Sequence, residues 1–360
     1  MTPLQKLETR SYIIRASHLT EDADDARGIG RCGTLDCADS CNGTGREDAR
    51  HLVHRREGGQ STLIVTPAKE SFLIDTGWGG ANGRDAKRIM ASVHDAGLAR
   101  IDYLMITHFH SDHDGGAPEL SKLVPISTFI DYGSPIETLK KVMEPYEAYA
   151  RVRRKGAHLE TKVGERLPLE GIEVQIVSGR GKTLSEPLAG AGQPNPACIT
   201  FKVRANDFTE NGRSLGFRLV FGKFRFLDLG DLVWNELGQL VCPKNMLGEA
   251  DVYLVAHHGN AFAAVPAVVA AVRPRVAIIN NGETKGGDPK TFNTLHGVPG
   301  LEDLWQLHRS ANKGANQADE QFIANLNEGT GYRIKLAASE DGSFTVTNAR
   351  TGFTKHYDAK

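Results

Sequence analysis

The chain has 360 residues and 40% apolar content, so it can bury a sizeable core within one α/β unit. Its 43 basic and 44 acidic side chains leave a formal net charge of −1, which argues against an extensive nucleic-acid-binding surface. No apolar stretch reaches the roughly 18 residues that a membrane span needs, so none is expected.

The first segment, residues 1–56, has little periodicity and is expected to be poorly ordered or atypical. It holds Cys32, Cys37 and Cys41, and the odd total of five cysteines indicates neither a metal site nor a neat disulfide framework. The start has no secretory signal, which favours the cytoplasm. When codons chosen for residues 50–56 are read one base out of frame, they encode a strand-like sequence. The alternative is therefore that the region before Glu57 is frame-shifted relative to an ancestor that had a first strand and an export signal. That ancestor would have been periplasmic.

Alternating strands and helices are expected from residue 57 onward, which predicts an α/β or α+β protein. We expect a catalytic domain over residues 57–290 and a C-terminal extension of helices and a hairpin over 291–360, packed on the same domain. The expected strands cover residues 61–65, 72–74, 101–106, 172–177, 199–204, 215–221, 224–229, 276–279, 332–336 and 343–348, and the expected helices cover 84–96, 118–123, 136–155, 265–272, 301–309 and 319–326.

A dense group of metal-ligand side chains follows the apolar run 101–106. Three imidazoles and a carboxylate stand within six positions: His108, His110, Asp112 and His113. Neutral imidazole and carboxylate suit Zn²⁺, with Mn²⁺ and Fe²⁺ as alternatives. A rigid strand ending at this point would aim the ligands, so the pattern predicts a metal site.

Other apolar runs also end on a ligand-type residue close to a glycine. Asp75 ends one such run, Asp231 ends a second, and the pair His257 and His258 ends a third. Because ligand-bearing sheets carry such residues at strand ends around one crevice, we expect these side chains to converge on the cluster. Asp228 competes with Asp231 for the acidic position.

These motifs resemble those of the metallo-β-lactamase superfamily of binuclear metal hydrolases. The combination of Asp-Thr-Gly, Leu-Gly-Asp-Leu and His-His-Gly is most similar to the metallohydrolase domains related to bacterial competence proteins. The resemblance covers roughly residues 57–290. It implies an αββα sandwich, in which two mixed β-sheets are flanked by helices, and two bound divalent ions.

The resemblance also implies how the ligands divide between the two ions. His108 and His110 would bind the first ion, Asp112 and His113 the second, and Asp231 would bridge them. His258 fits the register of the last ligand, which leaves His257 facing the substrate or a supporting partner, although the opposite assignment stays open.

Three of these residues are also candidates for catalytic support. Asp112 would handle the proton of the attacking water, and Asp75 would brace a ligand histidine through its free N–H. His257 is the candidate acid for the leaving group.

One expected ligand is missing, because many superfamily members supply a third histidine to the first ion. His158 is the only histidine between His113 and His257, and it is expected on the surface. Where the ligand belongs, residues 194–203 resemble the asparagine-containing segment of the competence-type relatives. The first ion would therefore be open, which favours an anionic substrate. Cys198 in this segment is expected to be a buried strand cysteine, with thiolate ligation as the alternative.

The Gly-rich run 281–289 is expected to be a plain surface loop. The alternative is a mobile loop that brings Lys285 toward the site.

Two ions that hold a hydroxide predict a hydrolase without a serine or cysteine nucleophile. A phosphoester or phosphodiester is the first expected substrate, and hydrolysis of an acyl-homoserine lactone or a β-lactam is the alternative, since fold does not determine function. A non-catalytic metal-binding protein is the third reading. The partner is expected to be a small molecule or phosphoester, and no obligate protein partner is evident.

Overall fold

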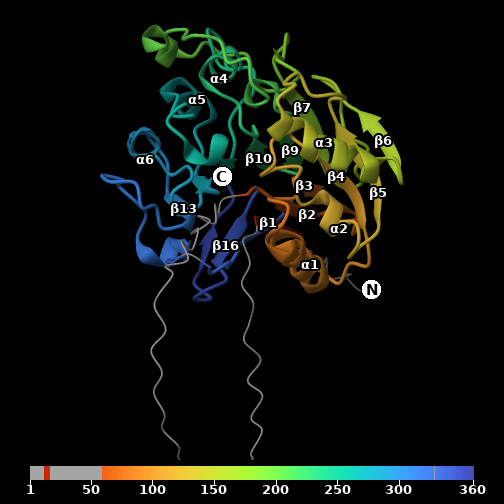
Figure 1. Cartoon of the computed structure of the whole chain (residues 1–360). Helices are drawn as coiled ribbons and strands as arrows, with labels where there is room; N and C mark the ends of the chain where they lie inside the picture. Colours follow the sequence, from red (N-terminus) through yellow and green to blue (C-terminus); the bar gives the residue numbers. More distant parts are fainter. Residues whose placement is uncertain (1–11, 17–58, 328) are drawn as a thin grey trace, which may run out of the picture.

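The computed structural model describes residues 12–16, 59–327 and 329–360. Two mixed β-sheets pack against each other and helices flank them (Figure 1). This confirms the expected αββα architecture. None of the helices in the described part of the chain combines the length and apolar character that a membrane crossing requires.

The first sheet has nine strands within the described residues, in the order β17-β16-β15-β1-β2-β3-β4-β5-β6. Neighbours pair antiparallel from β17 to β3 and parallel from β3 to β6. The strands are β1 (Tyr12–Ala16), β2 (Thr62–Val65), β3 (Ser71–Ile74), β4 (Ile101–Met105), β5 (Ile126–Asp131), β6 (Ala157–Glu160), β15 (Ile334–Ala338), β16 (Phe344–Asn348) and β17 (Thr354–Tyr357).

The second sheet has eight strands in the same described ranges, in the order β14-β13-β12-β11-β10-β9-β7-β8. Its parallel part runs from β14 to β10, and its antiparallel part from β10 to β8. The strands are β7 (Glu173–Gly179), β8 (Lys182–Thr183), β9 (Gly216–Phe221), β10 (Phe224–Asp228), β11 (Val252–Leu254), β12 (Val276–Ile279), β13 (Asp303–His308) and β14 (Ile323–Asn325).

The helices fall into two groups, α1 to α3 in the first half of the fold and α4 to α6 in the second (Figure 1). In α1, Ala86, Ile89 and Val93 are buried at the three- and four-residue spacing of a helix face. The α-helices are α1 (Arg84–Asp95), α2 (Ala117–Leu120), α3 (Lys140–Arg153), α4 (Trp234–Gln239), α5 (Pro266–Val272) and α6 (Pro289–His296).

Two apolar cores hold these layers together. The larger core lies between the sheets, where the rings of Phe72 from β3 and Phe217 from β9 meet with centroids 5.8 Å apart. The smaller core packs Val268 of α5 and Phe292 of α6 on the second sheet. The larger core also includes buried residues of α1, α2 and α3, so helices pack on the first sheet as well as on the second.

The segment at residues 199–204 was predicted as a strand, and this prediction is wrong. Residues Pro196–Thr200 form a 3₁₀ turn, and Cys198 forms a disulfide with Cys242. Asn195 donates hydrogen bonds to the carbonyls of Val241 and Ala267. These bonds tie the segment to the region of α4 and α5, so it has no partner strand. The interpretation of Cys198 as a strand cysteine is therefore wrong, and the described residues contain one disulfide where the cysteine count indicated no disulfide framework.

Two helices predicted near the C-terminus are strands. Residues 301–309 contain β13, which is buried between β12 and β14, and residues 319–326 contain a 3₁₀ turn (Glu320–Phe322) and β14. A short apolar run does not distinguish a buried strand from a helix, and the sheet decides here. The predicted hairpin is confirmed as β15 and β16.

The N-terminal region contributes one described element. Strand β1 (Tyr12–Ala16) pairs with β15 on one side and β2 on the other. A strand therefore stands before β2 in the sheet. The rest of residues 1–56, including the three other cysteines and the proposed frame-shifted stretch, lies outside the described residues.

Candidate metal centre

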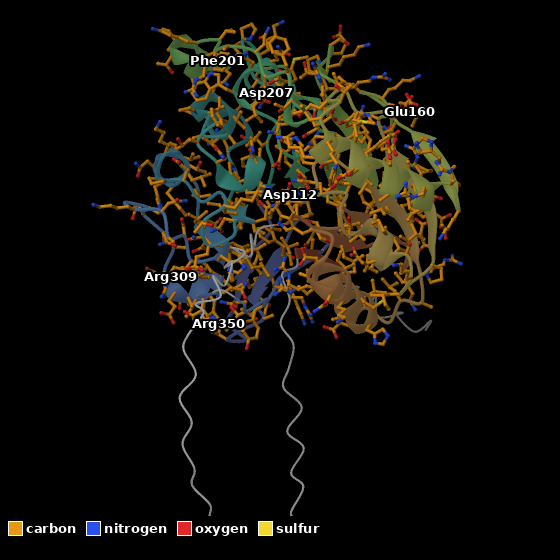
Figure 2. All side chains as sticks on the ribbon, viewed as in Figure 1. Asp112, Glu160, Phe201, Asp207, Arg309 and Arg350 are labelled. Atoms are coloured by element: carbon orange, nitrogen blue, oxygen red, sulfur yellow. A yellow bond between two sulfur atoms is a disulfide. The ribbon has the colours of Figure 1, made fainter. Side chains whose placement is uncertain are left out.

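The ligand-type residues lie where parallel strands of both sheets end. Asp75 follows β3 and the His108–His113 segment follows β4, while Asp231 follows β10 and His258 follows β11. Carboxyl ends of neighbouring parallel strands meet at one sheet edge. Figure 2 labels Asp112 near the middle of the molecule, between its two halves.

Among the described residues, one group of four has the spacing of metal ligands: Asp112, His113, Asp231 and His258. The Nε2 atom of His258 lies 3.3 Å from one carboxylate oxygen of Asp112 and 3.3 Å from one of Asp231. His113 Nε2 lies 3.2 and 3.3 Å from the same two oxygens. Ligand atoms about 2.0–2.2 Å from a tetrahedral ion lie about 3.3–3.5 Å apart, so these distances fit one ion.

Unsatisfied polar atoms point to the same conclusion. The Nε2 atoms of His113 and His258 and the Oδ1 atom of Asp231 are buried without a hydrogen-bond partner. Buried polar atoms in proteins nearly always have a partner. A bound cation would satisfy these atoms, and the donor set of two imidazoles and two carboxylates suits Zn²⁺ and related ions.

His108 and His110 form a second pair of candidate ligands beside this group. His108 Nε2 lies 3.1 Å from His110 Nδ1 and 4.0 Å from Asp231 Oδ2. Asp231 therefore faces both the pair and the group of four.

Asp75 braces His113 from behind. Its carboxylate accepts hydrogen bonds from His113 Nδ1 at 2.7 Å and from the backbone N–H and the hydroxyl of Thr107 at 2.8 Å each. Asp75 is fully buried, and its φ of 58° lies in the left-handed region. Such backbone strain is typical of functional sites, where surrounding contacts hold it.

The two adjacent histidines occupy different positions. His258 is buried and belongs to the group of four, whereas His257 Nε2 lies 3.8 Å from Asp231 Oδ2 and its side chain is 13% exposed. Both residues have positive φ, at 51° and 52°, so the turn directs neighbouring side chains differently. The geometry favours His258 as the ligand and leaves His257 at the edge of the site.

Asp228 does not join the site. Its Oδ1 accepts a hydrogen bond from the Gly230 N–H at 2.9 Å, and its Oδ2 is buried without a partner. Burial raises the pKa of this carboxyl to about 7. The group of four contains Asp231 instead.

The Gly-rich loop after β12 lies against the site, so its interpretation as a plain surface loop is wrong. The Gly287 N–H donates to the carbonyl of His258 at 2.9 Å, and a Cβ atom at Gly286 would stand 2.0 Å from that carbonyl. Only glycine fits there. Lys285 contacts a carboxylate oxygen of Asp112, and its Nζ lies 5.3 Å from the centre of the Trp78 ring.

The charges in the site balance one another. Burial would raise the pKa of Asp112, but Lys285 and His113 hold it well below its ordinary value. Likewise, His258 and His113 hold the pKa of Asp231 low against the effect of burial. For His113, burial is outweighed by the nearby carboxylates, chiefly Asp231, which raise its pKa well above the ordinary value. The carboxylates around His113 therefore favour its charged form when no cation is bound.

Residues 194–203 were expected where a further ligand of the first ion would lie, but this segment contacts the region of α4 and α5 instead. Residues just before β9 approach the candidate ligands. The Leu215 N–H donates to the carbonyl of Thr107 at 2.8 Å, and Ser214 Oγ accepts from the Asp231 N–H at 3.2 Å. The sequence contained a signal for this approach, because a polar run directly precedes β9, the strand that pairs with β10. His158 is exposed, as predicted, and lies 2.9 Å from Asp131.

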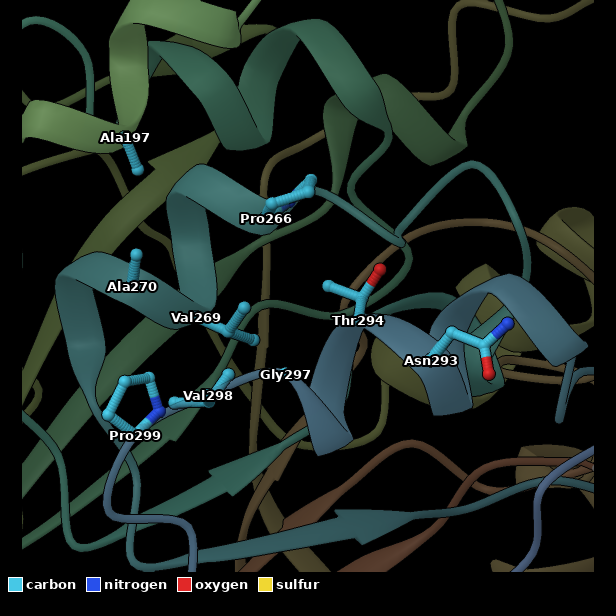
Figure 3. A pocket seen from close by; sticks show the side chains of 9 residues that line it. All are labelled: Ala197, Pro266, Val269, Ala270, Asn293, Thr294, Gly297, Val298 and Pro299. Atoms are coloured by element: carbon cyan, nitrogen blue, oxygen red, sulfur yellow. The ribbon is translucent and has the colours of Figure 1, made fainter.

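A separate cavity of about 400 Å³ lies between α5, α6 and the 3₁₀ turn at Pro196–Thr200 (Figure 3). Its lining is mainly apolar, as Val269, Val298 and Pro299 illustrate, and includes none of the candidate ligands. It offers no groups for metal chemistry.

The family model of the metallo-beta-lactamase superfamily matches residues 54–207. The match includes Asp75 and the His108–His113 cluster and ends before Asp231 and His258. The chain is therefore similar to this superfamily over residues 54–207. The narrower likeness to competence-type domains stays a prediction.

Comparisons with individual proteins cover shorter stretches or have low identity. The chain is 36% identical over 67 residues to an atrochrysone carboxyl ACP thioesterase of Aspergillus terreus, which is 19% of this chain and 20% of that protein. It is 29% identical over 105 residues to the lactamase-like protein notP of an Aspergillus species, 28% of this chain and 30% of that one. A solved diphosphatase from the PhnP family is 12% identical, with 91% of this chain and 99% of that chain covered and a TM-score of 0.38. The chain thus spans only a fifth to a third of these curated relatives.

Proposed function

We propose that this chain is a metal-dependent hydrolase that cleaves a phosphoester or phosphodiester bond. The observation that carries the proposal is the meeting of Asp112, His113, Asp231 and His258 at ligand spacing, with the Lys285 ammonium group at their edge. A cation beside a metal site favours an anionic substrate.

The proposed ligands divide into two sets. His108 and His110 would hold one ion, Asp112, His113 and His258 the other, and Asp231 both. Zn²⁺ suits these donors best, with Mn²⁺ or Fe²⁺ as alternatives. When bound, two such ions supply a hydroxide at neutral pH and polarise the oxygen under attack.

Other side chains of the chain would orient groups and move protons. Asp75 holds the Nδ1–H of His113, so that its Nε2 lone pair faces the proposed ion. Asp112 would take the proton of the attacking water. His257 is the proposed donor to the leaving group. Because burial lowers its pKa, it would first take that proton from the solvent to which its side chain is partly exposed.

Hydrolysis of an acyl ester, thioester, lactone or β-lactam is the second candidate function. Large apolar side chains are exposed on two loops that also carry or support candidate ligands: Ile136 and Leu139 flank Glu137, which contacts His110, and Phe262 follows the His257–His258 turn. The relatives named as thioesterases and lactamase-like proteins favour the same bond class. An apolar acyl group could lie on these side chains.

The test is a turnover panel with the metal-loaded chain. The substrates are bis(p-nitrophenyl) phosphate, an acyl-homoserine lactone, an acyl thioester and a chromogenic cephalosporin. We expect the phosphodiester to have the highest kcat/KM and Lys285→Met to reduce it more than turnover of the neutral esters. Faster turnover of a neutral ester by about 100-fold, or more, would reverse the ranking. Metal binding by wild type that is lost in Asp112→Ala, together with no turnover of any of these substrates, would instead identify a non-catalytic metal-binding protein.

The disulfide bears on where the chain folds. A Cys198–Cys242 bond is typical of proteins in oxidising compartments, so we infer that the exported alternative is favoured over the cytoplasm. Thiol titration of the denatured chain, with and without a reductant, tests whether the bond forms in cells. Full thiol reactivity without reductant would remove this inference.

A further inference from the structure

The loop between β5 and α3 contributes a carboxylate beside the proposed ligand His110. Glu137 Oε1 lies 3.2 Å from His110 Nε2. The other ring nitrogen, Nδ1, faces His108 Nε2 at 3.1 Å. The two nitrogens of His110 therefore face different partners, one a carboxylate and the other the proposed metal site.

A second carboxylate holds Glu137 in this position. Glu137 Oε1 accepts the backbone N–H of Glu210 at 2.8 Å. In return, Glu210 Oε1 accepts the N–H groups of Ile136 at 2.5 Å and of Glu137 at 2.9 Å. The other oxygen of Glu210 contacts the hydroxyl of Tyr132. Each acid thus satisfies the backbone of the other loop, which fixes both segments.

Burial makes these two carboxylates costly unless donors satisfy their oxygens. Glu210 is fully buried, and the side chain of Glu137 is only 10% exposed. A carboxylate in such a place needs N–H or O–H donors, because an unpaired one is costly. A proton on His110 Nε2 would supply a donor and leave the lone pair on Nδ1.

We propose that Glu137 is a positioning residue, which accepts the Nε2–H of His110 and so directs the Nδ1 lone pair toward the first ion. Glu210 holds Glu137 in place. The inference rests on the proposed metal site and extends it. It is the counterpart, on His110, of the contact that Asp75 makes with His113, because each carboxylate fixes the ring through the nitrogen that faces away from the ion.

The experiment compares Glu137→Ala and Glu137→Gln with wild type and with Glu147→Gln, which changes an exposed glutamate of α3. Zn²⁺ affinity and stoichiometry are measured by competition with a chromogenic chelator, and the visible spectrum of the Co²⁺-loaded chain reports ligand geometry. Urea unfolding of the metal-free variants shows whether each one folds.

We expect Glu137→Ala to weaken one of the two ions by about 10- to 100-fold and to change the Co²⁺ spectrum. Glu137→Gln keeps an acceptor oxygen, so its loss should be smaller, and Glu147→Gln should match wild type. Unchanged affinity for both ions in Glu137→Ala would overturn the proposal. Equal and complete loss of one ion in both variants would also overturn it, because it would make Glu137 a direct ligand. Should Glu137→Ala fail to fold, Glu137→Met removes the same acceptor while keeping a side chain of similar length, and unchanged affinity for both ions with an unchanged Co²⁺ spectrum in that variant would overturn the proposal.

Failure of the proposed function has a different outcome. If wild type itself binds no Zn²⁺, the metal site is wrong. If wild type binds two ions and Glu137→Ala binds them equally well, only the role of Glu137 is wrong.

Discussion

The two halves of the proposed metal site differ in how firmly the fold holds them. On one side, His113 is fully buried and its brace, Asp75, directly follows strand β3. On the other, the His110 side chain is 22% exposed and its contact, Glu137, belongs to a loop. Strand ends therefore supply histidine ligands to both halves, but the supporting carboxylate comes from a strand end in the closed half and from a loop in the open half. An open metal position is where substrate binds in catalytic sites.

The largest expected effect comes from removing the group that faces both halves. Asp231→Ala should weaken both ions and lower kcat/KM by more than about 100-fold, because a direct ligand contributes more than the supporting partners that cost about 10- to 100-fold. Metal content and kcat/KM measure this. The matched control is Asp228→Asn, a buried neighbour outside the group, which should keep both ions. A variant that loses only one ion would show that Asp231 serves one half.

Removing the brace of the closed half should have the next largest effect. Asp75→Asn keeps an acceptor for the Thr107 N–H but loses the charge that faces His113, so the second ion should bind about 10- to 100-fold more weakly. Chelator competition with Zn²⁺ measures it. The first ion should change little. An equal loss of both ions would mean that the two halves are not separate units.

The two halves should also differ in their response to pH. In the metal-free chain Asp231, Asp112 and Asp75 raise the pKa of His113 against the effect of burial, so the second ion must displace a proton. Its affinity should therefore fall about tenfold for each pH unit below that pKa. Burial and the neighbouring His113 and His110 lower the pKa of His108, so the first ion should depend less on pH near neutrality. Zn²⁺ titrations at about pH 6 and about pH 8 test this difference. Equal slopes would contradict it.

The smallest expected effect concerns stability and should leave metal binding unchanged. Burial raises the Asp228 pKa from 3.8 to about 7, so the folded state disfavours the ionised carboxyl. The wild-type chain should lose stability as the pH rises from about 4 to about 7, because the unfolded chain ionises first. Asp228→Asn avoids this loss and should be more stable at about pH 8, by about 1–2 kcal/mol after the unsatisfied amide is counted. Urea unfolding of metal-free protein at about pH 5 and about pH 8 measures it. A constant difference across this range would contradict the pKa shift.

Much of the closed half could be predicted because each ligand stands beside a strong local signal. Asp75, Asp231 and His258 each follow a short buried strand, and the His108–His113 cluster is dense in ligand types. The open half could not be predicted in the same way. Glu137 stands in an ordinary polar loop, and its importance comes from contact with Glu210, which lies 73 residues later.

The same difference between local and distant contacts separates the helices and strands that could be predicted from those that could not. Helix α1 was predictable from its own spacing of apolar residues. Strand β13 was not, since its character depends on β12 and β14 beside it. The 199–204 segment also failed, because the Cys198–Cys242 bond and the contacts of Asn195 outweigh its local preference for a strand.

The sequence by itself determined which residue types gather for metal chemistry and that strands and helices alternate along the chain, whereas the two-sheet arrangement was implied only by the family resemblance. Periodicity and ligand spacing are local properties, and they survive in the linear chain. Only the tertiary structure decided that His258 rather than His257 faces the carboxylates, that Lys285 contacts Asp112, and that Glu137 supports His110. Each of these features depends on the direction of a turn or on a contact between loops that are distant in the sequence. Such contacts form only when the two sheets pack together.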